Sequence, residues 1–411
     1  MTVPLTGVHL QPLTYVNEGE EVLVGRPDTG SYGVFPPEGA DLLRSLEAGA
    51  TLESAARQWH ERTGQTFDMA DFLAIIVDLG FVVGEDDALA QRPQVRWQRL
   101  ARAVFSPAAW LVYVAAVAGG LIAMVMDRDV RPGYGNIFFT SHIAFIPVAL
   151  ALSQIPLLLL HEAFHALAAR RLGLPSTLGI GRRFYYLVAE TRLNSLYSVP
   201  RRRRYLPFLA GSLIDATGVG IFTLLSVAGR HWGAPSWLSG LALALAFSGV
   251  LRISWECLFY LQTDYYFVIN TAAGCSDLHG AAQQRLRGWR QAVLRKAGLR
   301  TARLRRAAEE GDGDWSDRDL AAARWYAPLM VAGYGVSLAT LLLVGLPTAI
   351  RFWSIVVHRF SGSHQSVGVI VDTIFFILLS LIEFGLLGYV TVRDLRRRRA
   401  RTSLSNERNA S

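Results

Sequence analysis

The sequence predicts a mainly α-helical, polytopic membrane protein with a small α+β domain at its amino terminus. Of the 411 residues, 51% are hydrophobic and only 18% are charged, and the mean hydropathy is +0.27. The apolar residues fall in long blocks, all of which follow residue 90. Soluble enzymes of this length rarely have such a composition. We therefore expect about six transmembrane helices, preceded by a separate domain.

The first 90 residues combine β-like runs with helical periodicity. The pattern predicts three strands and then three helices, in the order Thr14–Val16, Glu21–Val24, Ser31–Phe35, Glu38–Glu47, Leu52–Thr63 and Met69–Leu79. Thr51 and Asp68 immediately precede the second and third helices, where a side-chain oxygen can cap the first turn. Because acidic side chains are frequent in this region, we do not expect nucleic acid as a partner.

Six apolar segments are long enough to cross about 30 Å of hydrocarbon as helices. They are Ala108–Met126, Ile137–Leu160, Leu206–Ala228, Trp237–Leu261, Ala327–Ile350 and Val367–Val390. The stretch Ala282–Ala323 predicts a basic surface helix and a flexible loop. The expected divisions are an amino-terminal domain (1–90), a membrane core (91–278), a basic helical connector (279–324), and two final membrane helices with a basic tail (325–411).

Arginine clusters alternate between the two sides of the predicted membrane spans. The formal net charge is +8, and because Lys296 is the only lysine, nearly all positive charge is arginine. Clusters precede the first span, separate the second from the third and the fourth from the fifth, and follow the sixth. Basic loops stay in the cytoplasm, so both termini are expected there, and no signal-peptide pattern opposes this. The clusters also predict contacts with anionic lipid headgroups.

The most specific motif lies at the end of the second predicted span, in LLLLHEAFHALAARRLG. His161 and His165 are four residues apart, which on a helix places both imidazoles on one face, where they can share a metal ion. Glu162 is placed to take a proton from a metal-bound water without being a ligand itself. Buried polar groups inside an apolar helix are energetically costly and often mark function.

A hydrolytic zinc site needs a third protein ligand and leaves a fourth position for water. Two aspartates compete for this role. Asp215 lies near the cytoplasmic end of the third predicted span, and Asp264 lies at the cytoplasmic end of the fourth. The predicted topology places both on the same side of the membrane as the two histidines, so the residues alone leave the choice open.

Three segments together resemble the site-2 protease class of membrane zinc metallopeptidases: a helix-terminal HEAFH, an AGSLID segment in the next span, and an aspartate closing the span after it. The resemblance covers roughly Ile137–Leu278. It is closest to the branch described as peptide zinc metalloproteases, because TDYYFVINTAAGCSDL reads as a variant of that branch's T-D-G-Y-Y-like segment. Ser212 replaces the family's proline, and Thr263-Asp264-Tyr265 replaces its L-D-G.

The resemblance assigns roles residue by residue. It implies that His161 and His165 are zinc ligands, that Glu162 is the catalytic base, and that Asp264 is the third ligand. Asp215 stands where the family usually has asparagine, so it is expected to support the ligands or to substitute for Asp264.

Two further features of the membrane core leave alternatives open. Arg252 and Glu256 are spaced i to i+4 in the fourth predicted span, which favours an ion pair. Such a pair could fix helix packing, or it could tune the metal site or admit water. The β-rich segment Leu178–Val199 predicts either a re-entrant or edge-strand element that pairs with an extended substrate, or a plain interfacial loop.

The strand and helix order of the first domain, with LEAGATLESAARQW followed by FLAIIVDLGFVV, resembles the PqqD-like winged-helix domain of ribosomal peptide maturation systems. This resemblance spans about Leu10–Gly84. It implies that an extended peptide adds to the edge of the strand containing Tyr32, Gly33, Val34 and Phe35 and lies against the last helix of the domain.

These expectations describe a zinc endopeptidase of the bacterial inner membrane that hydrolyses a peptide or membrane-tethered substrate near the cytoplasmic face. Ribosomal peptide maturation or export is the context that the resemblance implies. Intramembrane cleavage of a regulatory membrane protein is a variant of the same chemistry. The alternative is a non-catalytic peptide transporter or exporter subunit that retains the metallopeptidase scaffold. No particular oligomeric state is predicted.

Overall fold

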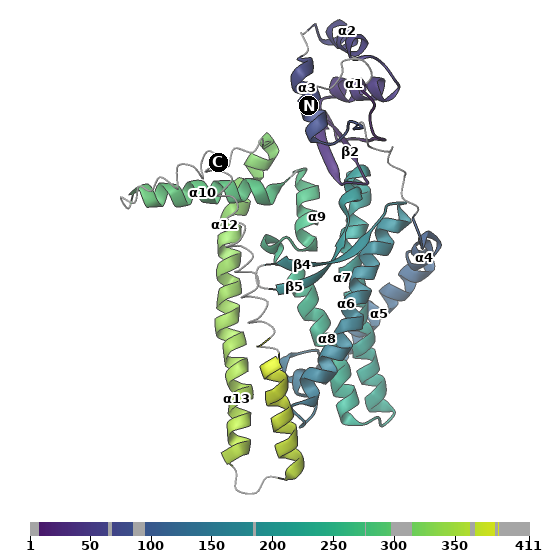
Figure 1. Ribbon diagram of the computed structural model, residues 1–411. Helices are drawn as coiled ribbons and strands as arrows, with labels where there is room; N and C mark the ends of the chain where they lie inside the picture. The colour runs from purple at the N-terminus through teal and green to yellow at the C-terminus, as the bar shows by residue number, and fades with distance from the viewer. Residues whose placement is uncertain are drawn as a thin grey trace. The chain divides into compact units, whose positions relative to one another are not determined.

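The computed structural model describes residues 8–64, 68–84, 95–183, 186–275, 277–296, 315–361, 366–382 and 385. These residues are mainly helical, with a small three-stranded sheet near the amino terminus (Figure 1). The chain folds as two compact units. The first contains Met1–Leu121, Pro156–Ile221 and Gly249–Tyr334, and the second contains Ile122–Ile155, Phe222–Ser248 and Gly335–Ser411.

The amino-terminal elements follow the predicted order. They are β1 (Thr14–Asn17), β2 (Val22–Arg26), β3 (Ser31–Phe35), α1 (Pro37–Glu47), α2 (Leu52–Thr63) and α3 (Met69–Asp78). The sheet is antiparallel, with β2 between β1 and β3. Thr51 accepts a hydrogen bond from the Ser54 backbone N–H, and Asp68 accepts from those of Ala70 and Asp71, so both predicted caps are confirmed.

One hydrophobic core holds this sheet and these helices together. Val24 of β2, Leu43 of α1 and Ile76 of α3 are fully buried. Each such side chain stabilises the domain by roughly 1.5–3 kcal/mol relative to an exposed one. Phe81 follows α3 and is also fully buried, and its carbonyl accepts a hydrogen bond from the Gln11 backbone N–H. The end of the domain is thereby joined to its beginning.

Five helices in the described residues are long and apolar enough to cross a membrane. They are α5 (Pro107–Met126), α6 (Phe145–Arg171), α7 (Arg201–His231), α8 (Ser236–Glu256) and a fifth that begins with α12 (Asp317–Thr340). The helix α12 continues through a π-helical turn (Leu341–Gly345) into α13 (Leu346–Ser361), and the apolar span itself runs from Asp317 to Leu343. Six spans were predicted. The sixth corresponds to a shorter apolar helix, Val367–Ile382, and most of its predicted remainder lies outside the described residues.

Apolar side chains cover the outer surface of these helices. On α5, Leu111 is 73% exposed and Val125 is 75% exposed, and Gly120 is the buried residue of the helix. A helix exposing this much apolar surface is typical of contact with lipid. Where α5 meets α7, a Cβ on Gly120 would lie 2.5 Å from the Cα of Gly220. Small residues thus allow close helix approach, which is a common feature of helix packing in membranes.

The second span begins and ends later than predicted. A 3-10 helix (Tyr134–Phe138) occupies the predicted start, and α6 begins only at Phe145. The carboxylate of Asp372 accepts hydrogen bonds from the backbone N–H groups of Ile143 and Ala144 just before α6, which hydropathy could not reveal. At the other end, α6 continues to Arg171 because the alanine-rich sequence after the apolar block still favours helix.

The chain between the fourth and fifth spans also differs from the prediction. After α8 come a 3-10 turn (Phe259–Leu261), α9 (Asp264–Ala273) and the basic α10 (Leu278–Lys296). The helix α12 then begins at Asp317, where Ser316 accepts from the Asp319 backbone N–H, so the predicted connector ends inside a helix. The arginines of the connector between residues 297 and 314, and the predicted basic tail, lie outside the described residues.

The segment between α6 and α7 forms a β-hairpin, which confirms its predicted β character. Its strands are β4 (Thr177–Arg183) and β5 (Tyr186–Arg192), and a 3-10 turn (Asn194–Ser198) leads into α7. The strands pair antiparallel, with Thr177 opposite Arg192 and Leu178 opposite Thr191. The role of this hairpin in substrate pairing stays a prediction.

Candidate metal centre

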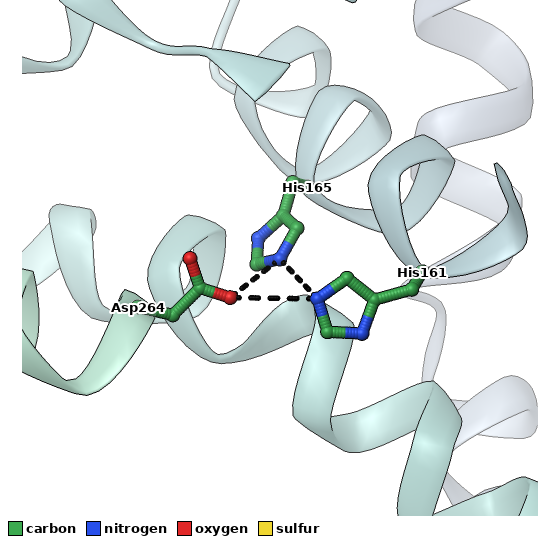
Figure 2. A group of neighbouring side chains, drawn as sticks. All are labelled: His161, His165 and Asp264. Carbon is green, nitrogen blue, oxygen red and sulfur yellow. Dashed lines mark hydrogen bonds and ion pairs between the residues drawn. The ribbon is translucent and has the colours of Figure 1, made fainter. Parts of the chain in front are cut away.

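Three side chains from two helices meet at one point in the first unit (Figure 2). His161 and His165 lie one turn apart on α6, and Asp264 lies in the first turn of α9. His165 Nε2 is 2.8 Å from Asp264 Oδ2, His161 Nε2 is 3.5 Å from the same oxygen, and the two Nε2 atoms are 3.1 Å apart. Three potential ligand atoms therefore converge on one small volume.

The other ring nitrogen of each histidine indicates where its proton lies. His165 Nδ1 is 2.7 Å from the carbonyl oxygen of Pro207, which can only accept, so Nδ1 donates. His161 Nδ1 is 2.8 Å from Asp215 Oδ2 and donates in the same way. With a cation bound, both rings would be neutral, and both Nε2 atoms would direct their lone pairs toward the cation. Their separations are close to the edge of about 3.3 Å expected for a tetrahedral zinc site.

Asp215 lies between His161 and Arg252. Its Oδ2 accepts from His161, and its Oδ1 accepts from Arg252 Nε at 3.0 Å and from an Arg252 terminal nitrogen at 2.9 Å. Asp215 is only 3% exposed, so the guanidinium offsets the charge of a buried carboxylate. Asp215 thus contacts the outer nitrogen of His161 and orients the imidazole, as carboxylates commonly do for histidine ligands.

Glu256 forms hydrogen bonds with the segment that contains Asp264. Its Oε2 accepts a hydrogen bond from the Asp264 backbone N–H at 2.8 Å, and its carbonyl accepts from the Thr263 hydroxyl at 2.7 Å. Between α8 and α9, Gln262 has a φ of 58°, which turns the chain. Asp264 therefore lies in a new helix after the break, whereas the sequence predicted it at the end of one continuous span.

Arg252 and Glu256 were predicted to form an ion pair, but in the described residues they contact different partners. The ion pair that the structure gives Arg252 is with Asp215 on α7, at 2.9 Å. The Glu256 carboxylate instead contacts the backbone of Asp264. Each residue holds one of the two aspartates, because side chains one helical turn apart can reach different neighbouring segments.

Glu162 lies on α6 next to His161 and is 6% exposed. Its Oε2 is 2.7 Å from the hydroxyl oxygen of Thr191 on β5, and the same hydroxyl is 2.9 Å from the Glu162 carbonyl oxygen. A buried carboxylate beside two histidines that could hold a metal ion is in the position that a general base would occupy.

The backbone of α7 passes directly beside the histidines. A Cβ on Gly211 would lie 2.3 Å from Nε2 of both His161 and His165. Only glycine therefore leaves room at this position, and the absence of its side chain shapes the candidate metal site.

The sequence prediction assigned no individual role to Thr191, Gly211 or Pro207, although Gly211 belongs to the AGSLID segment and Thr191 to the β-rich segment Leu178–Val199. Gly211 follows Ala210, and adjacent small residues in a membrane helix are a recognisable signal of close helix approach. Thr191 carries no such signal, because its contact with Glu162 joins residues 29 apart through a hairpin.

The predicted peptide-binding strand is β3, which pairs with β2 and lies at an edge of the sheet as ordered in the described residues. Val34 is 48% exposed, and the ring of Tyr32 packs near that of Tyr197, with centroids 5.8 Å apart. In the strand, Gly33 lies between Tyr32 and Val34, whereas the side chain of Phe35 is buried in the domain core. Side-chain contacts to a peptide would therefore come from Val34 and Tyr32 rather than from Phe35.

Glu18, in the turn after β1, contacts the start of α7. It accepts hydrogen bonds from Arg201 Nε at 2.9 Å and from Arg204 at 2.5 Å. Burial alone would raise the pKa of Glu18, but the two arginines outweigh it and hold the pKa below its usual value. A cavity of about 760 Å³ adjoins this contact, and its lining includes Glu18, Tyr32, Val34, Asn270 and Thr271.

No protein family, curated protein or solved structure matches this chain.

Proposed function

We propose that this chain is a membrane-embedded, zinc-dependent endopeptidase that cleaves a peptide or membrane-tethered substrate. The observation that carries the proposal is the convergence of His161, His165 and Asp264, with the Glu162 carboxylate beside them. Two histidines, one carboxylate and an adjacent carboxylate that is not a ligand are the parts of a hydrolytic zinc site.

In this proposal His161, His165 and Asp264 hold the zinc ion. When bound, zinc would polarise the scissile carbonyl and make water a better nucleophile at neutral pH. Glu162 accepts the proton of the attacking water and passes it to the leaving amine, because its carboxylate is buried and is not among the converging ligand atoms. Asp215 and Arg252 keep the His161 imidazole oriented while this happens.

The proposed setting is the bacterial inner membrane, with the site near the cytoplasmic face. Support comes from the five apolar helices and from the alternation of arginine clusters in the sequence. The basic helix α10 would contact anionic lipid headgroups. The likeness of the first domain to PqqD-like domains supports a ribosomally made peptide as the substrate class, with processing during maturation or export.

The test uses the full chain in detergent with fluorescently labelled casein, an unstructured polypeptide, as the probe. We expect hydrolysis that a zinc chelator abolishes and added zinc restores. Glu162→Gln should retain zinc and lose at least about a thousandfold in rate, because only the proton acceptor is removed. Undiminished hydrolysis in this variant would contradict the proposal. Zinc binding without hydrolysis of casein or of membrane-tethered peptides by the wild type would favour the non-catalytic transporter subunit.

A further inference from the structure

The Thr191 hydroxyl is the closest polar contact that the structure gives the Glu162 carboxylate, at 2.7 Å from Oε2. It comes from β5 of the hairpin, a different element from the helix that carries Glu162. The same hydroxyl lies 2.9 Å from the Glu162 carbonyl oxygen, so one side chain contacts both the backbone and the carboxylate of this residue.

The chemistry of these groups fixes the direction of the hydrogen bond. An ionised carboxylate and a carbonyl oxygen can only accept, whereas a hydroxyl has one proton to donate. Thr191 therefore donates to Glu162, and the charge of the carboxylate makes Oε2 the stronger acceptor. This hydrogen bond lowers the basicity of Oε2, so Oε1 is the stronger proton acceptor of the two oxygens.

We infer that Thr191 is a positioning residue for Glu162: its hydroxyl holds the carboxylate in one orientation, so that the same oxygen always faces the reaction. The inference rests on the proposed peptidase function and adds a residue to it. Glu162 has several side-chain torsions, and fixing them before reaction removes an entropic barrier. Thr191 suits this task because a β-branched side chain on a strand has few rotamers of its own.

Two substitutions separate the hydroxyl from the shape of the side chain. Thr191→Val keeps the branched shape and removes the donor, and Thr191→Ser keeps the donor. Thr177→Val is the matched control, because Thr177 is exposed on β4 of the same hairpin. For each full-length variant, kcat and KM on labelled casein are measured, together with zinc affinity by competition with a chelator.

We expect Thr191→Val to lower kcat roughly ten- to a hundredfold, the effect of one hydrogen bond to a charged group. Its KM and zinc affinity should match those of the wild type, Thr191→Ser should restore most of kcat, and Thr177→Val should change nothing. A wild-type kcat in Thr191→Val would overturn the inference. A decrease in kcat that is equally large in Thr191→Ser would also overturn the inference. So would a decrease in kcat that is accompanied by an equal decrease in zinc affinity.

Measuring Glu162→Gln in the same experiment separates a failure of the positioning role of Thr191 from a failure of the proposed peptidase function. If Glu162→Gln is inactive and Thr191→Val is fully active, the positioning role is wrong while the peptidase function stands. If Glu162→Gln hydrolyses casein as fast as the wild type, Glu162 is not the base and the proposed peptidase mechanism is wrong. Should Thr191→Val fail to fold, Thr191→Ala removes the same hydroxyl without adding a methyl group, and the same outcomes apply.

Discussion

At the residue scale, the site depends on contacts that orient its ligands as much as on the ligands themselves. His161 is held by Asp215, and Asp215 by Arg252, so the charge of a partly buried guanidinium reaches a potential zinc ligand through one carboxylate. Asp264 depends in a similar way on Glu256, which fixes its backbone. These contacts predict graded effects on zinc affinity.

Asp215→Ala should weaken zinc binding about ten- to a hundredfold without abolishing it, because His161 loses its hydrogen-bond partner but keeps its ligand atom. Arg252→Met should weaken it in the same direction, since Asp215 then lacks its counter-charge. Competition with a chelator measures both. Arg230→Met is the control, because Arg230 lies at the other end of α7 with its side chain 42% exposed. Complete loss of zinc in Asp215→Ala alone would instead make Asp215 a ligand.

The sequence predicted the candidate metal ligands better than it predicted the residues that orient them. The four-residue spacing of His161 and His165 follows from helical periodicity, and topology narrowed the third ligand to two aspartates. Which aspartate is the third ligand, however, depends on the turn at Gln262, which brings Asp264 to the histidines. It also depends on the nitrogen of His161 that each carboxylate contacts: Asp215 contacts Nδ1, and Asp264 contacts Nε2. Such contacts arise only when the helices pack.

At the scale of elements, the approach of α7 to α6 predicts a strong effect at one glycine. Gly211→Ala would place a methyl group 2.3 Å from both Nε2 atoms, so the histidines or the helix must move. We expect zinc affinity to fall at least about tenfold. Gly335→Ala is the matched control, because this helical glycine has open space around it and its alanine variant should bind zinc normally. Wild-type zinc affinity in Gly211→Ala would show that α7 lies farther from the site.

Elements with strong local signals were predicted well, and those set by distant contacts were not. The strands, helices and caps of the first domain follow from alternation, periodicity and capping residues. The start of α6 depends on Asp372, more than 220 residues away in sequence, and α12 begins in a polar turn that hydropathy assigns to a loop. Hydropathy locates apolar segments, whereas helix ends depend on hydrogen bonds.

At the scale of the whole molecule, Glu18 joins the amino-terminal domain to the start of α7 within the first unit. The pKa of Glu18 is lowered in the folded state, because Arg201 and Arg204 outweigh the effect of burial. The contact therefore stabilises the fold fully above the pKa of an unfolded glutamate, about 4.3, and is lost as the pH falls through the lower folded value.

Glu18→Gln should lower the melting temperature by roughly 2–5 °C at pH 7, because the three charge-assisted hydrogen bonds from Arg201 and Arg204 are weakened. The difference from the wild type should persist to about pH 4 and narrow below it, as the wild-type carboxyl also becomes neutral. Glu61→Gln, at an exposed position of α2, should melt like the wild type at every pH. A Glu18→Gln difference that is absent at pH 7 would show that this contact contributes no stability.

If His161, His165 and Asp264 form a zinc site, the purified full chain contains the metal, so its zinc content is the decisive measurement. Elemental analysis of the detergent-solubilised wild type, His161→Ala and Asp264→Ala is the measurement. We predict about one zinc per chain in the wild type and almost none in either variant, because each variant leaves only two ligands. A wild type that binds no zinc when zinc is supplied, or an Asp264→Ala variant with full zinc content, would contradict the account.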